Sequence, residues 1–212
     1  MPASPTDKPT AEPADKPTDD WSTRHSVQAV AARTAALVNV LDDENASPEA
    51  VAEVLRAHGE RGRFELTASD LAELRASAAS LREVFAAADV DHAASTLNAL
   101  LGRGSGPLRL SSHGGATPWH PHLDSADDAP WGEWFLASSC LALTVLLWDR
   151  QRPPGGVCAS PSCRNVHLTQ GSGPPRRYCS RRCATRERVA AHRARGATGA
   201  EGLPPGPSTP GP

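Results

Sequence analysis

Four cysteines near the C-terminus form two local pairs, and this spacing constrains the fold more than any other feature of the sequence. Cys158 and Cys163 enclose four residues, and Cys179 and Cys183 enclose three. Four thiolates satisfy tetrahedral zinc and leave no open position, so such a zinc is structural rather than catalytic. The main alternative is a disulfide pair, but paired cysteines in a reducing compartment favour metal. The sequence therefore predicts one structural Zn²⁺ bound by these four residues.

This cysteine segment is short, and a short segment buries too little apolar surface to fold alone. Metal binding is therefore expected to supply much of its folding free energy. His167 lies between the two pairs and is a possible ligand by residue type, but four cysteines leave it no coordination position. Residues 168–175, before Arg176, are predicted to form a hairpin tip.

Charge is divided unevenly along a chain whose formal net charge is only −2. Residues 1–149 contain 11 Lys and Arg against 22 Asp and Glu, a net charge of −11. Residues 150–195 contain 11 Arg against the single acid Glu187, a net charge of +10. Positive charge at this density suits a polyanion such as nucleic acid. The simpler alternative is a solubilising, arginine-rich end.

The segment after Cys179 is predicted to be a helix capped by Ser180. Its arginines cover about half of the circumference at 3.6 residues per turn. The opposite face carries Cys183, Glu187 and alanines, and we expect it to pack on the zinc site or on the rest of the protein. The candidate nucleic-acid contacts are Arg176, Arg177, Arg181, Arg182, Arg186, Arg188, Arg193 and Arg195. About six to eight phosphate contacts would make binding strongly salt-dependent.

Composition divides the rest of the chain. We expect a disordered tail at 1–22, a helical domain at 23–150, the zinc finger at 151–197 and a second disordered tail at 198–212, because both tails are rich in proline and poor in apolar residues. The N-terminus has no apolar signal segment. The longest apolar run, residues 135–148, is too short to span a bilayer and is expected to be a core helix. These features predict a cytoplasmic protein without membrane contact.

The expected fold class is mainly α with a small β-hairpin element. Ser47 and Pro48 fit the start of one helix and Gly59 its end, and Thr67 or Ser69 caps the next.

Three further segments complete the predicted fold. Residues 91–103 form another helix ended at Gly102, and residues 131–150 form the most buried one. Residues 37–41, LVNVL, fit helix or strand. Two short extended runs flank residues 113–115 and predict a β-hairpin.

Three histidines lie on this predicted hairpin: His113, His120 and His122. Two histidines at i and i+2 are able to bind metal, but no acidic or cysteine partner has a convincing spacing, so a metal is not expected here. Cys140 lies within the apolar helix and is predicted to be a small buried hydrophobe.

The sequence gives little indication of a ligand pocket or a catalytic site. The tryptophans of the body are expected to be core residues rather than the lining of a ligand pocket; they are Trp119, Trp131, Trp134 and Trp148. The sequence has no defensible nucleophile–base pair, glycine-rich phosphate loop or pair of catalytic carboxylates. We therefore do not expect an enzyme.

The cysteine segment resembles the CGNR zinc finger family. Members contain C-x4-C, a hairpin, a basic-aromatic-Cys step, and C-G-N-R followed by a basic helix. The matching residues here are Cys158, Cys163, 176–179 (RRYC), 183–186 (CATR) and 192–195 (HRAR). Cys183 and Arg186 of the signature are kept, whereas Ala and Thr replace its Gly and Asn.

In this family a helical domain called ABATE precedes the finger, and the likeness extends over about residues 24–197. Members are regarded as bacterial stress-related transcription regulators. The resemblance therefore implies a DNA partner, with the helical domain sensing a small-molecule effector or mediating pairing of chains. It gives no oligomeric state.

Two alternatives remain open. The finger could bind RNA or a protein instead of duplex DNA, although only Tyr178 is aromatic within it and base stacking is therefore poorly supported. The basic segment could also dock on the acidic body of its own chain, since the two carry opposite charges.

Overall fold

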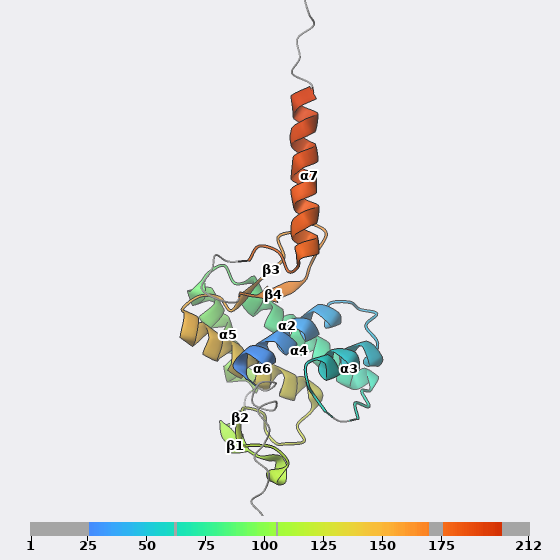
Figure 1. Cartoon of the computed structure of the whole chain (residues 1–212). Coiled ribbons are helices and arrows are strands. Elements are labelled where there is room, and N and C mark those ends of the chain that lie inside the picture. The colour runs from blue at the N-terminus through green and yellow to red at the C-terminus, as the bar shows by residue number, and fades with distance from the viewer. Residues whose placement is uncertain (1–25, 62, 105, 170–175, 201–212) are drawn as a thin grey trace, which may run out of the picture.

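The computed structural model describes residues 26–61, 63–104, 106–169 and 176–200 (Figure 1). The tails predicted to be disordered, 1–22 and 198–212, fall largely outside these ranges. The helices and strands are α2 (Val27–Leu41), α3 (Pro48–Ala57), α4 (Ala68–Ala86), α5 (Val90–Gly104), β1 (Arg109–Ser111), the 3-10 turn η1 (His113–Gly115), β2 (His120–His122), α6 (Trp131–Arg150), β3 (Gly155–Val157), β4 (Val166–Leu168) and α7 (Arg181–Ala200). The protein is mainly α with two small antiparallel sheets, as predicted.

Helix α6 is the centre of the body and packs against α2, α4 and α5. Its buried side chains include Phe135 and Leu143, both with no exposed surface. The helix has 20 residues, longer than the apolar run that predicted it, and by length and composition it is long enough to cross a membrane. Because its apolar side chains fill the core of the helical body, its packing is that of a core helix, as predicted.

Local capping signals place the helix ends where the sequence indicates. The Ser47 side chain accepts from Ala50 N at 3.2 Å, and Gly59 lies just beyond α3 with a φ of +86°, a conformation that glycine tolerates. Thr67 and Asp70 form a reciprocal capping box at the start of α4.

The structure decides one alternative that the sequence left open and moves one predicted helix end. The LVNVL segment is helical throughout, as part of α2, because its apolar residues pack on the neighbouring helices. Helix α5 continues past Gly102 to Gly104, so this glycine does not end it. Gly102 is exposed, and a single glycine in an exposed helix position costs only about 1 kcal/mol.

The two hairpins lie at opposite ends of the helical body (Figure 1). Strands β1 and β2 pair antiparallel around the turn at 113–115, as predicted. Strands β3 and β4 also pair antiparallel, with Val157 opposite Val166, so the second hairpin turns at the first cysteine pair. The predicted hairpin tip at 168–175 is therefore not where this hairpin turns; its residues 170–175 lie outside the described ranges.

The second hairpin shares the core of the body. Val166 and Leu168 of β4 are buried at 2% and 6% exposure and belong to the same apolar cluster as the helices. Phe85 of α4 lies so close to Gly155 that a Cβ added at residue 155 would be 2.6 Å from its ring. The finger therefore rests on the body through packed apolar contacts rather than through a bare linker.

Candidate metal centre

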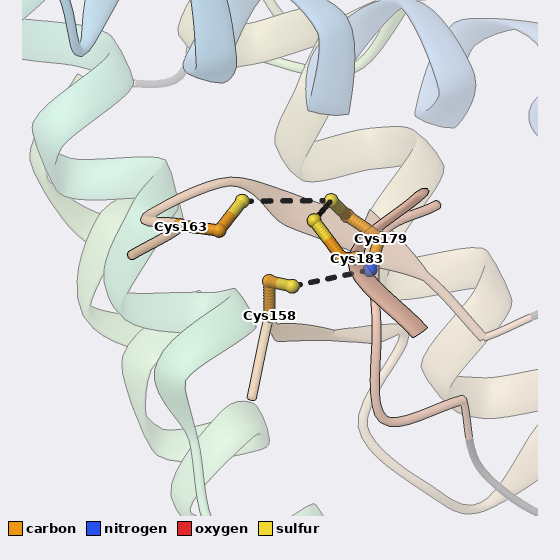
Figure 2. Close-up of side chains that lie close together, drawn as sticks. All are labelled: Cys158, Cys163, Cys179 and Cys183. Atoms are coloured by element: carbon orange, nitrogen blue, oxygen red, sulfur yellow. Dashed lines mark hydrogen bonds between the residues drawn. The ribbon is translucent and has the colours of Figure 1, made fainter. Parts of the chain in front are cut away.

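The four cysteines converge between the second hairpin and the start of α7 (Figure 2). The Sγ atom of Cys179 lies 3.6 Å from that of Cys163 and 3.8 Å from that of Cys183. All four Sγ atoms lie within 4.8 Å of one another, and the cysteines are free thiols. Sulfur separations of this size are far from the disulfide bond length of about 2.05 Å. The geometry therefore favours a metal site over a disulfide.

Two local motifs aim these sulfurs at one point. Residues 158–163 form a tight turn closed by a hydrogen bond from Cys163 N to the Ser160 carbonyl at 2.9 Å. Ser180 caps α7, as predicted, because its Oγ accepts from Cys183 N at 3.2 Å. The second cysteine pair therefore spans the first turn of a helix.

The arrangement fits zinc. Four sulfurs placed about 2.3 Å from a tetrahedral ion lie about 3.8 Å from one another, close to the observed Sγ–Sγ distances of 3.6 and 3.8 Å. Residues 156–196 match the family model of the CGNR zinc finger. The match covers the finger and not the helical body, and no curated protein matches the chain. Cys158, Cys163, Cys179 and Cys183 are positioned to bind one zinc ion, with all four positions supplied by protein.

Backbone N–H groups already favour charge on one sulfur of the CGNR finger. Burial opposes ionisation of Cys158, but hydrogen bonds from the N–H groups of Cys179 and Ser160 outweigh it and lower the pKa of this thiol to about 7. The Cys158 sulfur is therefore prepared to be a thiolate ligand.

His167 positions the chain before the second cysteine pair. Its Nε2 donates to the Arg176 carbonyl at 2.8 Å, and Ala159 N donates to the Arg177 carbonyl at 2.7 Å. These bonds tie the two halves of the finger together. Burial lowers the pKa of His167, so the neutral ring is favoured. As expected from four available cysteines, His167 is not part of the converging set.

A set of side-chain hydrogen bonds that was not predicted from the sequence holds α7 against the first turn of the finger. The buried Ser160 hydroxyl donates to a Glu187 carboxylate oxygen and accepts from Arg186 at 2.6 Å. Arg186 also lies 3.6 Å from the Cys183 sulfur. A zinc ion with four thiolates carries two negative charges, so a guanidinium beside Cys183 offsets part of them. Arg186 is predicted to contact nucleic acid, but its guanidinium contacts Ser160 and the Cys183 sulfur, although 44% of the side chain is exposed.

All eight predicted arginines have exposed side chains. Arg176 and Arg177 precede Cys179, and the guanidinium of Arg176 donates to the Cys179 carbonyl at 2.8 Å. Arg181 and Arg182 begin α7, and the remaining arginines follow along that helix.

The second half of α7 differs from the expectation. Its small face was expected to pack on the zinc site or the body, yet Ala190, Ala191 and Ala194 are exposed, as is every residue from 188 to 195. The helix leaves the body and extends away from it (Figure 1). Only the first two turns, through Cys183 and Glu187, pack on the finger. Residues 188–195 are exposed on every face of the helix.

The tryptophan prediction is wrong for two residues. Trp119 and Trp148 are 71% and 73% exposed. Trp131 and Trp134 pack on the edge of the core, and Trp134 also lines a cavity of about 560 Å³ together with Arg33. Cys140 is buried as predicted, and burial raises the pKa of its thiol to about 12.

The histidine prediction needs correction as well. His113, His120 and His122 come together at the first hairpin, and two carboxylates lie against them: Asp124 beside His122 and Asp127 beside His113. Asp124 is only two residues from His122, so an acidic partner was present in the sequence at short range.

Proposed function

We propose that the protein is a DNA-binding transcription regulator whose zinc-stabilised finger holds an arginine-bearing helix against the phosphate backbone. The observation that carries this proposal is the second half of α7. Residues 188–195 form a helix that is exposed on every side and bears Arg188, Arg193 and Arg195. An arginine-bearing helical stretch that buries no face against the described part of the chain suits contact with a partner outside it.

The charges favour a polyanion as that partner. Residues 176–195 carry the eight exposed arginines against one acid, and Glu187 is already engaged with Ser160. Because Arg186 faces the zinc site, the phosphate-facing set is reduced to the other seven. An α-helix fits the major groove of duplex DNA, and arginine binds phosphate in a bidentate manner.

An RNA-binding or protein-interaction role is the alternative. Single-stranded RNA is usually bound by aromatic side chains that stack on bases. Tyr178 is the single aromatic residue of the finger; it is half-buried, and the guanidinium of Arg177 lies 5.7 Å from its ring centroid. This arrangement gives little support to base stacking, so duplex DNA remains the proposal.

The helical body would supply regulation. Its likeness to the ABATE domain and the cavity beside Trp134 both suit a small-molecule effector. Docking of the basic helix on the acidic body is less supported, because α7 extends away from the body (Figure 1). A DNA partner and reduced thiol ligands both suit the cytoplasm.

The test is a binding titration of the zinc-loaded full chain with a mixed-sequence duplex at about 50 mM and 200 mM salt. We expect binding that weakens steeply with salt. The double variant Arg188→Gln/Arg193→Gln should reduce the slope of log K against log salt by about 2, one for each lost phosphate contact. Arg63→Gln, which removes an exposed arginine of the body, is the matched control and should leave the slope unchanged.

Two further measurements decide between the alternatives. Cys179→Ser should abolish both zinc retention and DNA binding, because the base of α7 depends on the metal. If affinity is insensitive to salt, or if the control reduces the slope as much as the α7 variant, the proposal is wrong. Preferential competition by single-stranded RNA would establish the alternative.

A further inference from the structure

The first hairpin brings three imidazoles to one point, at the end of the body opposite the CGNR finger (Figure 1). The Nε2 atom of His120 lies 3.3 Å from Nε2 of His113 and 2.9 Å from Nε2 of His122. One potential ligand atom from each of the three lies within 4.8 Å of the others. We propose that His113, His120 and His122 bind a divalent transition metal, with zinc as the ion to test first.

The hydrogen-bond partners of the other ring nitrogens fix which nitrogen carries the proton. His120 Nδ1 lies 2.8 Å from the Pro118 carbonyl, which only accepts, so Nδ1 is the donor. His122 Nδ1 lies 2.9 Å from a carboxylate oxygen of Asp124, and His113 Nδ1 lies 3.4 Å from one of Asp127. In a neutral imidazole whose Nδ1 donates, Nε2 is the nitrogen that is able to bind a metal.

The Nε2 separations of 2.9 and 3.3 Å are within hydrogen-bonding distance, and which ring donates depends on where the protons lie. A cation bound by the same three nitrogens would occupy the point on which they converge. A metal ion about 2.0–2.1 Å from each nitrogen, with tetrahedral angles, places the nitrogens about 3.3 Å apart. The observed spacing is thus close to that of a coordinated set.

The surrounding contacts are those that metal-binding histidines need. A ligating imidazole usually donates its other N–H to a carboxylate or a carbonyl, which orients the ring and raises its basicity. Two rings have such a partner at hydrogen-bonding distance, Pro118 for His120 and Asp124 for His122, and a carboxylate oxygen of Asp127 lies 3.4 Å from Nδ1 of His113. Asp124 is itself buried at 2% exposure and is held by Arg109 at 2.6 Å.

The backbone of the turn that carries His113 is strained. His113 has a φ of +47°, an uncommon conformation for a residue with a side chain. Such outliers persist where the surrounding structure holds them, often at binding sites. Its N–H is anchored by Ser111 Oγ at 3.0 Å, and Ser111 donates to Asp127 at 2.7 Å. The carboxylate that orients the His113 ring thus also ties down the turn that carries it.

The ion would border the cavity of about 560 Å³, which the three histidines line together with Trp134 and Arg33. Among the residues that the structure describes, three protein ligands converge at this point. Three ligands leave the fourth position of a tetrahedral ion for water or a small donor ligand. This differs from the closed four-cysteine site, so an effector that enters the cavity could bind the metal directly.

The experiment counts metal in the full chain after zinc loading and dialysis. We expect two zinc ions per chain in the wild type and one in His120→Ala. His92→Ala, which removes an exposed histidine of α5, is the control and should keep two. One zinc per chain in the wild type, with no further equivalent taken up in a calorimetric zinc titration, would overturn the proposal. So would two ions whose number is unchanged in His120→Ala.

Cobalt substitution separates this site from the finger and reports on folding. Thiolate-to-cobalt charge-transfer absorption arises only from the four cysteines, so His120→Ala should retain it while losing one metal. His113→Ala is a second variant, on the other side of the hairpin turn, and should also bind one ion. If either variant keeps two metals with the thiolate band intact, the histidines are not the ligands.

Discussion

The side-chain amide of Asn39 in α2 makes both backbone hydrogen bonds of Val166 in β4. Asn39 Nδ2 donates to the Val166 carbonyl at 3.1 Å, and Val166 N donates to Asn39 Oδ1 at 2.7 Å. One edge of β4 pairs with β3, and the backbone groups on its other edge pair with the side chain of Asn39. A single residue of the body thus completes the sheet of the finger.

Replacing this amide should loosen the finger. Asn39→Ala leaves one buried N–H and one buried carbonyl without partners, and we expect the free energy of unfolding to fall by about 2–4 kcal/mol. Denaturant unfolding of the zinc-loaded protein measures it. Asn45→Ala, at an exposed loop asparagine, is the control and should change little. Equal losses in the two variants would contradict the role given to Asn39.

Two adjacent glycines of β3 should differ in how much the same substitution destabilises the fold. A Cβ at Gly155 would lie 2.2 Å from the His167 carbonyl oxygen and 2.6 Å from the Phe85 ring, whereas one at Gly156 would lie no closer than 3.5 Å to the His167 ring. We expect Gly155→Ala to cost about 1–3 kcal/mol through overpacking. Gly156→Ala should be near neutral. Thermal unfolding compares them, and similar effects would rule out close packing on Phe85.

The ion pair between Arg33 and Glu60 should be far more important than a surface pair. Arg33 is 4% exposed, and burial lowers the pKa of its guanidinium while Glu60 acts in the opposite direction. Glu60→Gln leaves a buried charge uncompensated, and we expect a loss of about 3–5 kcal/mol. Glu65→Gln breaks the exposed pair with Arg63 and should cost less than about 1 kcal/mol. Chemical denaturation distinguishes the two.

The capping box of α4 predicts a pH dependence. Hydrogen bonds from the N–H and hydroxyl of Thr67 hold the pKa of Asp70 below its usual value. A depressed carboxyl pKa stabilises the fold above the unfolded value of about 3.9, and this contribution disappears as pH falls through the folded pKa. The gap in unfolding temperature between wild type and Asp70→Asn should therefore narrow from about pH 6 to about pH 3. Both proteins lose zinc alike in acid, so a constant gap would count against the prediction.

Arg186 and Arg188 should have separable roles although they are two residues apart. Arg186→Gln removes the guanidinium beside the Cys183 sulfur, and we expect zinc affinity to fall by about 10- to 100-fold, as for other outer-shell changes. Arg188→Gln should leave zinc affinity unchanged and lower the salt slope of DNA binding by about 1. Competition with a chromogenic chelator measures zinc affinity. The assignment fails if the two variants release zinc equally.

Sequence reasoning succeeded where the signals are local. The cysteine pairs, the Ser180 cap and the Thr67–Asp70 box each depend on residues within one or two turns, so their patterns predict the geometry directly. The main contacts it missed are between distant segments. Asn39 is 127 positions from Val166, and its only signal was a polar residue inside an apolar helical run.

Contacts within the finger and among the three histidines were likewise not predicted from the sequence. Ser160 and Glu187 are 27 positions apart and meet where the 158–163 turn lies against α7, and neither belongs to a recognisable motif. His113 is separated from His120 and His122 by the hairpin turn. The sequence predicted the hairpin but not the side-chain directions, so the convergence of the three rings was not predicted. The exposure of Trp119 and Trp148 was equally hidden, because large apolar residues are usually buried.

Because α7 is long, the contact between Asn39 and Val166 influences where the far end of this helix lies. Twenty helical residues form an arm about 30 Å long, whose base is set by the hairpin that Asn39 holds. Tilting that base by about 10° would swing the far end by about 5 Å, more than one base-pair step of about 3.4 Å. A small shift of α2 would therefore be amplified along α7 and would displace the arginines of this helix by several ångströms.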